Sequence, residues 1–216
     1  MAGERWATFD CYGTLIDWNG GIGRQLDRLF GAERHDELLA RYHELERSVE
    51  HEHPAESYRV VMATVLDRLG APEVERDALE RSLPDWEPFP EVPDALEEAR
   101  ARGWKLVILS NTDREFIEVS MARIGVPFEL AIVASEIGSY KPGHRHWEAF
   151  TARTGADPAR HVHVAASLFH DVAPANELGL PTVWINRLGE RPGPEPTREL
   201  PDLAQLADTL DDLVAA

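Results

Sequence analysis

The chain places polar side chains capable of nucleophilic chemistry where short apolar segments end. These residues are Asp10, Thr14, Ser110, Asn111, Lys141 and Asp171. A carboxylate can attack an electrophilic carbon or phosphorus atom and form a covalent intermediate. A lysine, a hydroxyl group and loop amides can stabilise negative charge on the substrate or the intermediate. The residue types therefore indicate covalent catalysis on a small anionic substrate, with Asp10 as the nucleophile and Lys141 and Ser110 in an anion-binding cradle.

Each of these residues also has an ordinary structural interpretation. Asp10 could accept hydrogen bonds from the amides of the loop that follows it, and Lys141 could be a solvated lysine. Ser110, Asn111 and Asp171 could cap the helices that follow them. The catalytic interpretation depends on their joint occurrence, in this order, at the ends of predicted strands.

The elements that would position these residues alternate between strand and helix. Predicted strands cover residues 6–11, 105–110, 130–134, 161–166 and 181–185. Predicted helices cover residues 93–103, 114–124, 144–154, 174–178 and 201–214, and residues 189–199 are expected to form a mobile loop. This alternation is typical of a parallel sheet with crossover helices. The carboxyl ends of parallel strands meet at one edge of the sheet, where open α/β folds bind ligands.

A separate helical segment interrupts this pattern after the first predicted strand. Apolar residues recur at helical spacing in residues 22–30, 36–49, 57–69 and 73–83. Four prolines between residues 84 and 93 mark a linker, since proline cannot continue a helix. We therefore predict an α/β protein with a core domain made of residues 1–16 and 88–216. Residues 17–87 would form an all-helical cap subdomain over the ligand edge.

Composition limits the compartments and partners that the chain favours. Its 216 residues include 39 acidic and 22 basic side chains, which gives a formal net charge of −17 and disfavours binding to nucleic acid or an anionic membrane. The single cysteine cannot form an intrachain disulfide. The sequence shows neither a secretion signal nor the roughly 18 consecutive apolar residues of a membrane span. We expect a cytoplasmic protein.

The ordered motifs resemble the haloacid dehalogenase (HAD) superfamily, and more closely its L-2-haloacid dehalogenase (type II) branch. The resemblance rests on FDCYGTLID (9–17), ILSNTD (108–113), SYKPG (139–143), VAASLFHD (164–171) and LGLPTVWINR (178–187). It implies a Rossmann-like core, and a homodimer is a further expectation. In the implied site Asp10 is the nucleophile, oriented and neutralised by Thr14 and Lys141. Ser110 and Asn111 would bind the substrate carboxylate or position the nucleophile.

Two positions separate this chain from the phosphatases of the superfamily. Those enzymes carry an aspartate two residues after the nucleophile and a metal-binding carboxylate in the fourth motif, where this chain has Tyr12 and Ala166. Magnesium prefers near-octahedral oxygen ligation, so we expect no metal and no other cofactor. A halide leaves without protonation, and the resemblance favours a metal-independent dehalogenase. Asp10 would displace halide from C2 of a 2-haloacid, and water, activated by Asp171, would hydrolyse the ester to a 2-hydroxy acid.

Other positions depart from the pattern of the dehalogenase branch. Its Ser-Ser-Asn in the fourth motif corresponds here to Ala166, Ser167 and Leu168, and its tyrosine six residues after the motif lysine corresponds to Trp147. The cap arginine that receives halide or substrate falls near Glu50 or His51, with Arg47, Arg59 and His53 as alternative polar contacts. The substrate-binding residues that we expect, besides Ser110 and Asn111, are Cys11, Tyr12, Trp147, His51 and Ser167. Trp18 is a second candidate wall of the pocket.

Several alternatives remain open at this point. The H-x-H pair at residues 51 and 53 could bind zinc, but it has no partner at the helical spacing of known sites, and the other histidines are scattered. Cys11 could be a nucleophile, although buried cysteines usually pack in the core. Two other functions compete with the dehalogenase: a phosphatase acting on a small phosphate ester, and a non-catalytic protein that uses the capped pocket for binding.

Overall fold

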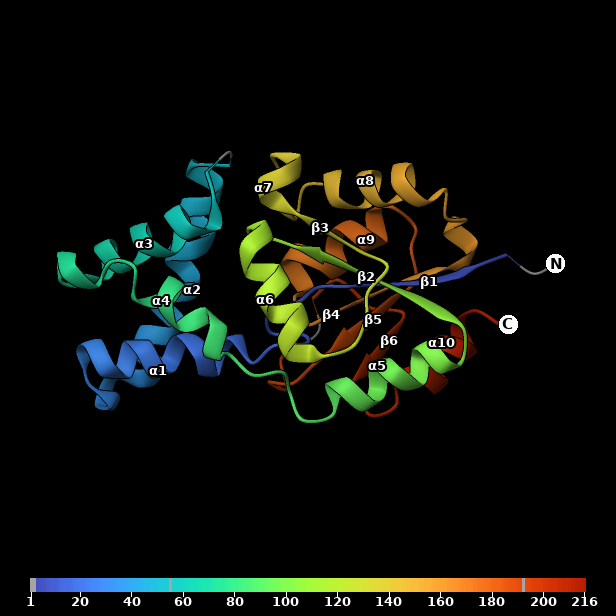
Figure 1. The fold of residues 1–216 in the computed structure, drawn as a ribbon, viewed down its shortest axis with the longest axis horizontal. Coiled ribbons are helices and arrows are strands. Elements are labelled where there is room, and N and C mark those ends of the chain that lie inside the picture. The colour runs from blue at the N-terminus through green and yellow to red at the C-terminus, as the bar shows by residue number, and fades with distance from the viewer. Residues whose placement is uncertain (1–2, 55, 192) are drawn as a thin grey trace.

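A parallel sheet forms the centre of the computed structural model, which describes residues 3–54, 56–191 and 193–216 (Figure 1). Its strands are β1 (Arg5–Phe9), β2 (Trp104–Ser110), β3 (Leu130–Val133), β4 (His161–Ala165), β5 (Thr182–Ile185) and β6 (Arg198–Leu200). Every pair of neighbours is parallel, and the order across the described sheet is β3-β2-β1-β4-β5-β6. The first strand of the sequence therefore lies at the centre, as the predicted α/β class requires.

Helices cover both faces of this sheet because alternate strand residues point to opposite sides. The covering helices are α5 (Val92–Ala101), α6 (Arg114–Ile124), α7 (Ala134–Ile137), α8 (Arg145–Thr154), α9 (Ala173–Glu177) and α10 (Leu206–Leu213). Ile108 of β2 packs in the core cluster that includes residues of α5, α6 and α10. Its neighbours Val107 and Leu109 pack in the second cluster, with residues of α8 and α9. Both faces of the sheet are thus apolar, and the polar side chains lie at the strand ends.

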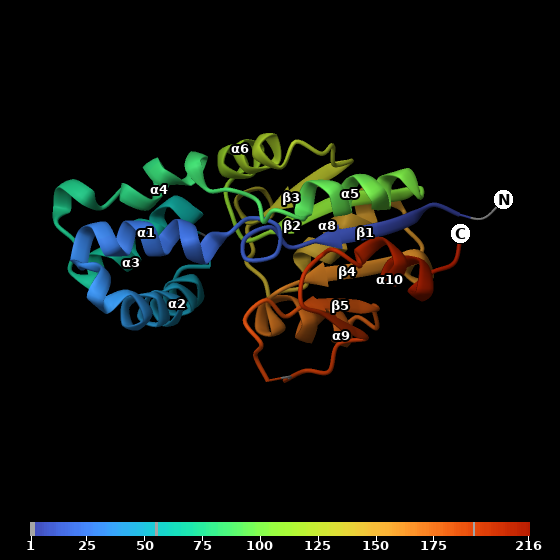
Figure 2. The ribbon, with the colours of Figure 1, turned by 90° about the horizontal axis from the view of Figure 1, so that it is seen from below.

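The chain between β1 and β2 forms the helical cap. It contains α1 (Trp18–Phe30), α2 (His35–Glu52), α3 (Tyr58–Leu69) and α4 (Ala78–Ser82), with short 3-10 turns at Ala32–Arg34, Glu73–Glu75 and Leu83–Asp85. These helices lie together beyond the carboxyl ends of the strands (Figures 1 and 2). Ser57 begins α3 by accepting a hydrogen bond from the Val60 amide, and Gly70 ends it in the left-handed conformation at φ 85°. All four helices fall within the predicted cap range of residues 17–87.

Two local predictions need correction. The segment 189–199 was expected to be a loop, but Arg198 and Glu199 begin β6, which pairs with β5 at the edge of the sheet. The prediction failed because two of the three β6 residues are exposed, so the strand lacks the apolar run that marks a buried strand. The last helix begins at Leu206 rather than at residue 201.

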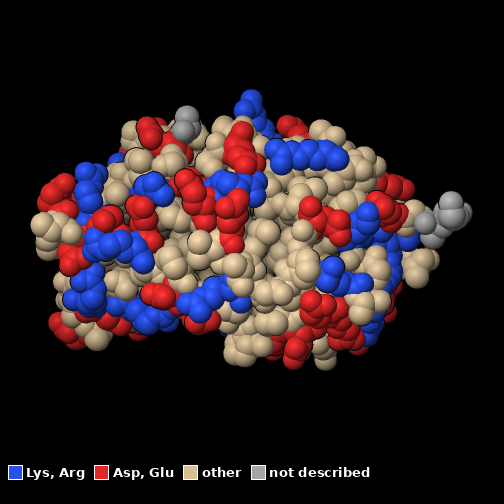
Figure 3. Space-filling view, in the orientation of Figure 1, with Lys and Arg blue, Asp and Glu red and all other residues tan. Residues whose placement is uncertain are grey.

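The surface carries both charge signs. On the face in Figure 3, acidic and basic side chains are interspersed over the cap and the core. Many of them form exposed pairs, such as Arg28 with Glu75 and Arg68 with Glu52. None of the helices in the described ranges is long and apolar enough to cross a membrane.

Candidate active site

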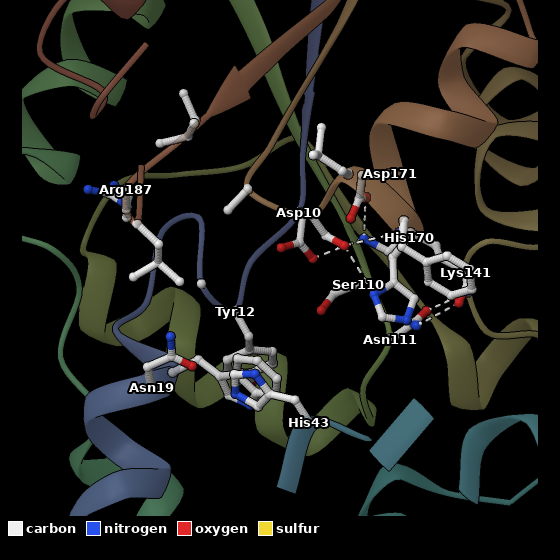
Figure 4. Close-up of a pocket in the computed structure, with 18 of the residues that line it drawn as sticks. Asp10, Tyr12, Asn19, His43, Ser110, Asn111, Lys141, His170, Asp171 and Arg187 are labelled. Carbon is white, nitrogen blue, oxygen red and sulfur yellow. Dashed lines mark hydrogen bonds and ion pairs between the residues drawn. The ribbon is translucent and has the colours of Figure 1, made fainter. Parts of the chain in front are cut away.

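The polar residues singled out in the sequence lie at strand ends under the cap. Asp10 directly follows β1, and Ser110 is the last residue of β2. Lys141 lies in the loop between α7 and α8, and Asp171 lies in a π-helical turn, Leu168–Val172, that follows β4. The central position of β1 in the sheet brings these four residues together, as Figure 4 shows.

Asp10 is held by one donor on each carboxylate oxygen. Oδ1 accepts a hydrogen bond from Lys141 Nζ at 2.9 Å, and Oδ2 accepts one from Thr14 Oγ1 at 2.9 Å. Thr14 Oγ1 in turn accepts a hydrogen bond from the Ala166 amide at 2.9 Å. These contacts fix the plane of the carboxylate, as an attacking nucleophile requires.

Lys141 has no spare hydrogen-bond donor. Besides Asp10, its ammonium nitrogen donates to Asp171 Oδ1 at 2.6 Å and to the Leu109 carbonyl at 2.9 Å, which accounts for all three N–H groups. The side chain is only 1% exposed. Lys141 therefore acts on a bound anion mainly through its charge, unless one of these hydrogen bonds is exchanged.

The side chain of Asn111 positions this lysine. Its Oδ1 accepts a hydrogen bond from the Lys141 backbone amide at 2.6 Å, and its Nδ2 donates to the Lys141 carbonyl at 3.0 Å. Ser110 Oγ, by contrast, is buried and has no hydrogen-bond partner in the described structure. Because a buried hydroxyl without a partner is unfavourable, Ser110 is the better placed of the two residues to bind a ligand.

The electrostatics of the site keep the lysine charged. Burial lowers the pKa of Lys141, but Asp10 and Asp171 outweigh this effect and raise it above its ordinary value. Burial raises the pKa of Asp10, and Lys141 opposes that rise. Burial also raises the pKa of Asp171, but Lys141 and a hydrogen bond from His163 lower it by more, so that it lies below the ordinary value. Asp171 is therefore the more firmly ionised carboxylate, and Asp10 is the more basic nucleophile.

A buried hydrogen-bond chain behind Asp171 was missed in the sequence. Nε2 of His163 lies 3.0 Å from Asp171 Oδ1, and its Nδ1 lies 2.8 Å from Thr8 Oγ1. The Thr8 hydroxyl also contacts Nε2 of His161 at 2.7 Å. If Nε2 of His163 donates to the carboxylate, its Nδ1 must accept from Thr8. The sequence signal was the i, i+2 spacing of the two histidines, which places both on one face of β4.

A cavity of about 390 Å³ opens in front of Asp10. The lining residues singled out in the sequence are Asp10, Tyr12, Trp18, Arg47, Glu50, Ser110, Asn111, Lys141, Ser167 and Asp171. The residues that were not predicted include His43, Glu46, His170 and Arg187. Figure 4 shows His43 and Asn19 across the cavity from Asp10 and Lys141. The cap and the core therefore both contribute side chains to this site.

Three expected substrate-binding residues lie outside the cavity lining. Cys11 is fully buried in the core, where burial raises its thiol pKa well above the ordinary value. Trp147 is 2% exposed and packs edge-on against His163 at 5.1 Å between ring centroids, on the α8 side of the sheet. His51 is exposed. It follows Glu50 on α2, and a rotation of about 100° per residue turns it away from the cavity.

The chain belongs to the haloacid dehalogenase-like hydrolase family, whose family model matches residues 5–179. It is 31% identical to an (S)-2-haloacid dehalogenase of Pseudomonas sp. (strain YL), over 94% of this chain and 93% of that protein. It is 28% identical to (S)-2-haloacid dehalogenase H-109 of Pseudomonas putida, over 94% and 96% of the two chains. A solved L-2-haloacid dehalogenase from Xanthobacter autotrophicus, with chloropropionic acid covalently bound, shares the fold with a TM-score of 0.82. That match has 18% identity and covers 99% of this chain and 100% of the other.

Proposed function

We propose that this protein is a hydrolase of carbon–halogen bonds that acts on small 2-haloalkanoic acids. The observation that carries the proposal is Asp10, fixed by Lys141 and Thr14 and facing the cavity. The relatives named (S)-2-haloacid dehalogenases, which align over nearly the whole chain, support the same reaction class.

In the first step, a carboxylate oxygen of Asp10 attacks C2 of the substrate. The C2–halogen bond breaks, the electron pair leaves with the halide, and an ester forms between Asp10 and C2. The substrate carboxylate must approach the Asp10 carboxylate, and like charges repel. Lys141 offsets this repulsion through its charge, and the unpartnered Ser110 hydroxyl is available to hold the substrate carboxylate.

In the second step, water attacks the ester carbonyl carbon. The bond between this carbon and the ester oxygen breaks, and the product leaves as a 2-hydroxy acid. One proton of the water goes to the product hydroxyl, and the other is taken up by a base and released to solvent. Asp171 Oδ1 accepts from two donors, whereas buried Oδ2 has no partner in the described structure and is free to orient this water.

Two features weigh against a phosphatase mechanism. The Tyr12 hydroxyl is bonded to Ser120 Oγ at 3.0 Å, and burial raises its pKa, so it is a poor substitute for a carboxylic acid that protonates a leaving group. The carboxylates of Asp10 and Asp171 are both paired with the Lys141 ammonium, and the fourth-motif position that carries a metal-binding carboxylate in the phosphatases is Ala166. This donor set does not fit a magnesium site, and we propose a metal-independent reaction.

The test is a direct comparison of two reactions. The purified protein is incubated with (S)- and (R)-2-chloropropionate in the presence of a chelator, and separately with p-nitrophenyl phosphate with and without magnesium. We expect chloride release that does not respond to chelator, with one enantiomer preferred. Magnesium-dependent phosphate release without chloride release would establish the phosphatase instead. No turnover in either assay would favour a binding protein.

A further inference from the structure

Two glutamates of the cap face the same cavity as the nucleophile. Glu46 and Glu50 lie one turn apart on α2, are 5% and 8% exposed, and both line the cavity. Residues four apart on a helix lie on one face, where like charges repel each other. A buried pair of this kind is costly unless a cation or a proton compensates it.

Neither glutamate forms an ion pair with a lysine or arginine in the part of the chain that the structure describes. Glu46 Oε1 accepts a hydrogen bond from the Tyr58 hydroxyl at 2.7 Å. Glu50 Oε2 lies 3.6 Å from His170 Nε2, but burial lowers the pKa of His170 to about 4, so this ring is neutral at pH 7. Within the described ranges, no lysine or arginine nitrogen lies within 4.0 Å of either carboxylate. Arg47 lines the same cavity, and Arg47 and Lys141 lower the pKa of Glu50 from a longer distance, but burial outweighs both.

Burial favours the protonated form of both carboxyl groups. Burial raises the pKa of Glu46 to about 7, and burial together with the nearby Glu46 raises that of Glu50 well above its ordinary value. Two carboxyl groups of this kind can ionise fully once a positive charge is placed between them. A cationic ligand would therefore gain two charge-assisted hydrogen bonds in a site with little competing water.

A second observation points to a ligand in the same cavity. Ser110 Oγ is buried, has no partner in the described structure and lies beside Asp10 and the charged Lys141 (Figure 4). The core side of the cavity thus offers a hydroxyl donor and a positive charge, which suit a carboxylate. The cap side offers two acceptors, which suit a group rich in N–H donors.

We infer that the substrate carries an ammonium group as well as its carboxylate and halogen, with the ammonium bound between Glu46 and Glu50. The substrate class is then an amino-substituted 2-haloalkanoate. For the reacting end of the molecule, this inference rests on the proposed dehalogenase function. For the cap end, it rests on the burial of Glu46 and Glu50 in the cavity wall without a lysine or arginine within 4.0 Å in the described ranges.

The first experiment compares 6-amino-2-chlorohexanoate with 2-chlorohexanoate in the halide-release assay. We expect kcat/KM for the amino compound to be higher by on the order of 10-fold, because hydrogen bonds between an ammonium group and carboxylates are charge-assisted. The ratio should fall to about one in the double variant Glu46→Gln, Glu50→Gln. It should be unchanged in Glu44→Gln, a matched control on the exposed face of α2. A wild-type ratio at or below one, or a ratio that survives the double variant, overturns the inference.

The second experiment separates this inference from the proposed reaction. Calorimetric titration with 6-aminohexanoate and with hexanoate measures recognition by the cavity without any chemistry. We expect tighter binding of the amino compound in the wild type and loss of this preference in the folded double variant, verified by its thermal unfolding. If neither chloro acid releases halide while the binding preference persists, the proposed reaction fails and the cation site stands. Equal or tighter binding of hexanoate removes the cation site.

Discussion

The ammonium nitrogen of Lys141 lies 2.9 Å from Oδ1 of Asp10, and both side chains are almost completely buried. This ion pair aligns the nucleophile, but it also means that one of the three N–H groups of Lys141 donates to the nucleophile itself. The charge of Lys141 is therefore shared between Asp10, Asp171 and any bound anion. The consequences of that sharing can be measured.

Replacing Lys141 with methionine should impair both activity and folding. Two buried carboxylates lose their common partner, and removing one member of a buried ion pair typically costs about 3–5 kcal/mol. We expect halide release to fall at least ~100-fold, because substrate anion and nucleophile then repel without compensation. Urea unfolding and chloride release measure the two effects. The control is Lys105→Met, which changes the only other lysine, paired with Glu4 at the surface. It should alter neither the stability to urea nor the rate of chloride release. Equal behaviour of the two variants would contradict this role of Lys141.

Replacing His163 with phenylalanine should slow the second step of the reaction more than the first. Asp171 loses one of the two donors on Oδ1, so its free oxygen is less well placed to orient water. We expect a rapid burst of halide followed by 2-hydroxy acid formation that is slower by on the order of 10- to 100-fold. His163→Gln, which retains an N–H donor, should recover part of the rate, and His144→Gln near the surface should behave as wild type. Equal slowing of both products would argue for a general loss of structure.

Glu46 should make the protein less stable as the pH rises. Its pKa is about 7 in the folded state and near 4.5 in the unfolded state. Its contribution to the free energy of unfolding is therefore fully present below about pH 4.5 and is lost as the pH passes 7. Between pH 5 and pH 8, Glu46→Gln should remove up to about 2–3 kcal/mol of the pH-dependent change in unfolding free energy. Urea unfolding at the two pH values, with Glu44→Gln as control, measures this difference. A pH dependence unaffected by Glu46→Gln would show that its carboxyl is not perturbed.

The sequence predicted the core of the site because strand ends are easy to locate. A continuous apolar run ends at Ser110, and Asp10 follows another, so the parallel topology brings both residues to one edge. The roles of Lys141 and Asp171 were predicted from the order of the motifs along the chain. The alternation of elements also predicted the sheet and the inserted helices, although not the short polar strand β6.

The residues that the sequence did not reveal depend on tertiary contacts. Glu46 and Glu50 lie in a helix with many charges, where carboxylates are normally solvated, and only packing against the core shows that they are buried. Trp147 was assigned to the pocket from its spacing to the motif lysine. Spacing alone cannot determine which side of a loop or sheet a helix covers, and α8 packs Trp147 against β2 and β3.

The most direct test of the central claim is the fate of the water oxygen. The protein is allowed many turnovers of 2-chloropropionate in oxygen-18 water, and the peptide that contains Asp10 is weighed together with the 2-hydroxy acid product. Attack by Asp10 predicts heavy oxygen in the Asp10 carboxylate, with the first product oxygen unlabelled, and Asp10→Asn should release no halide while remaining folded. Heavy oxygen in the product hydroxyl from the first turnover, with Asp10 unlabelled, would contradict covalent catalysis by this residue.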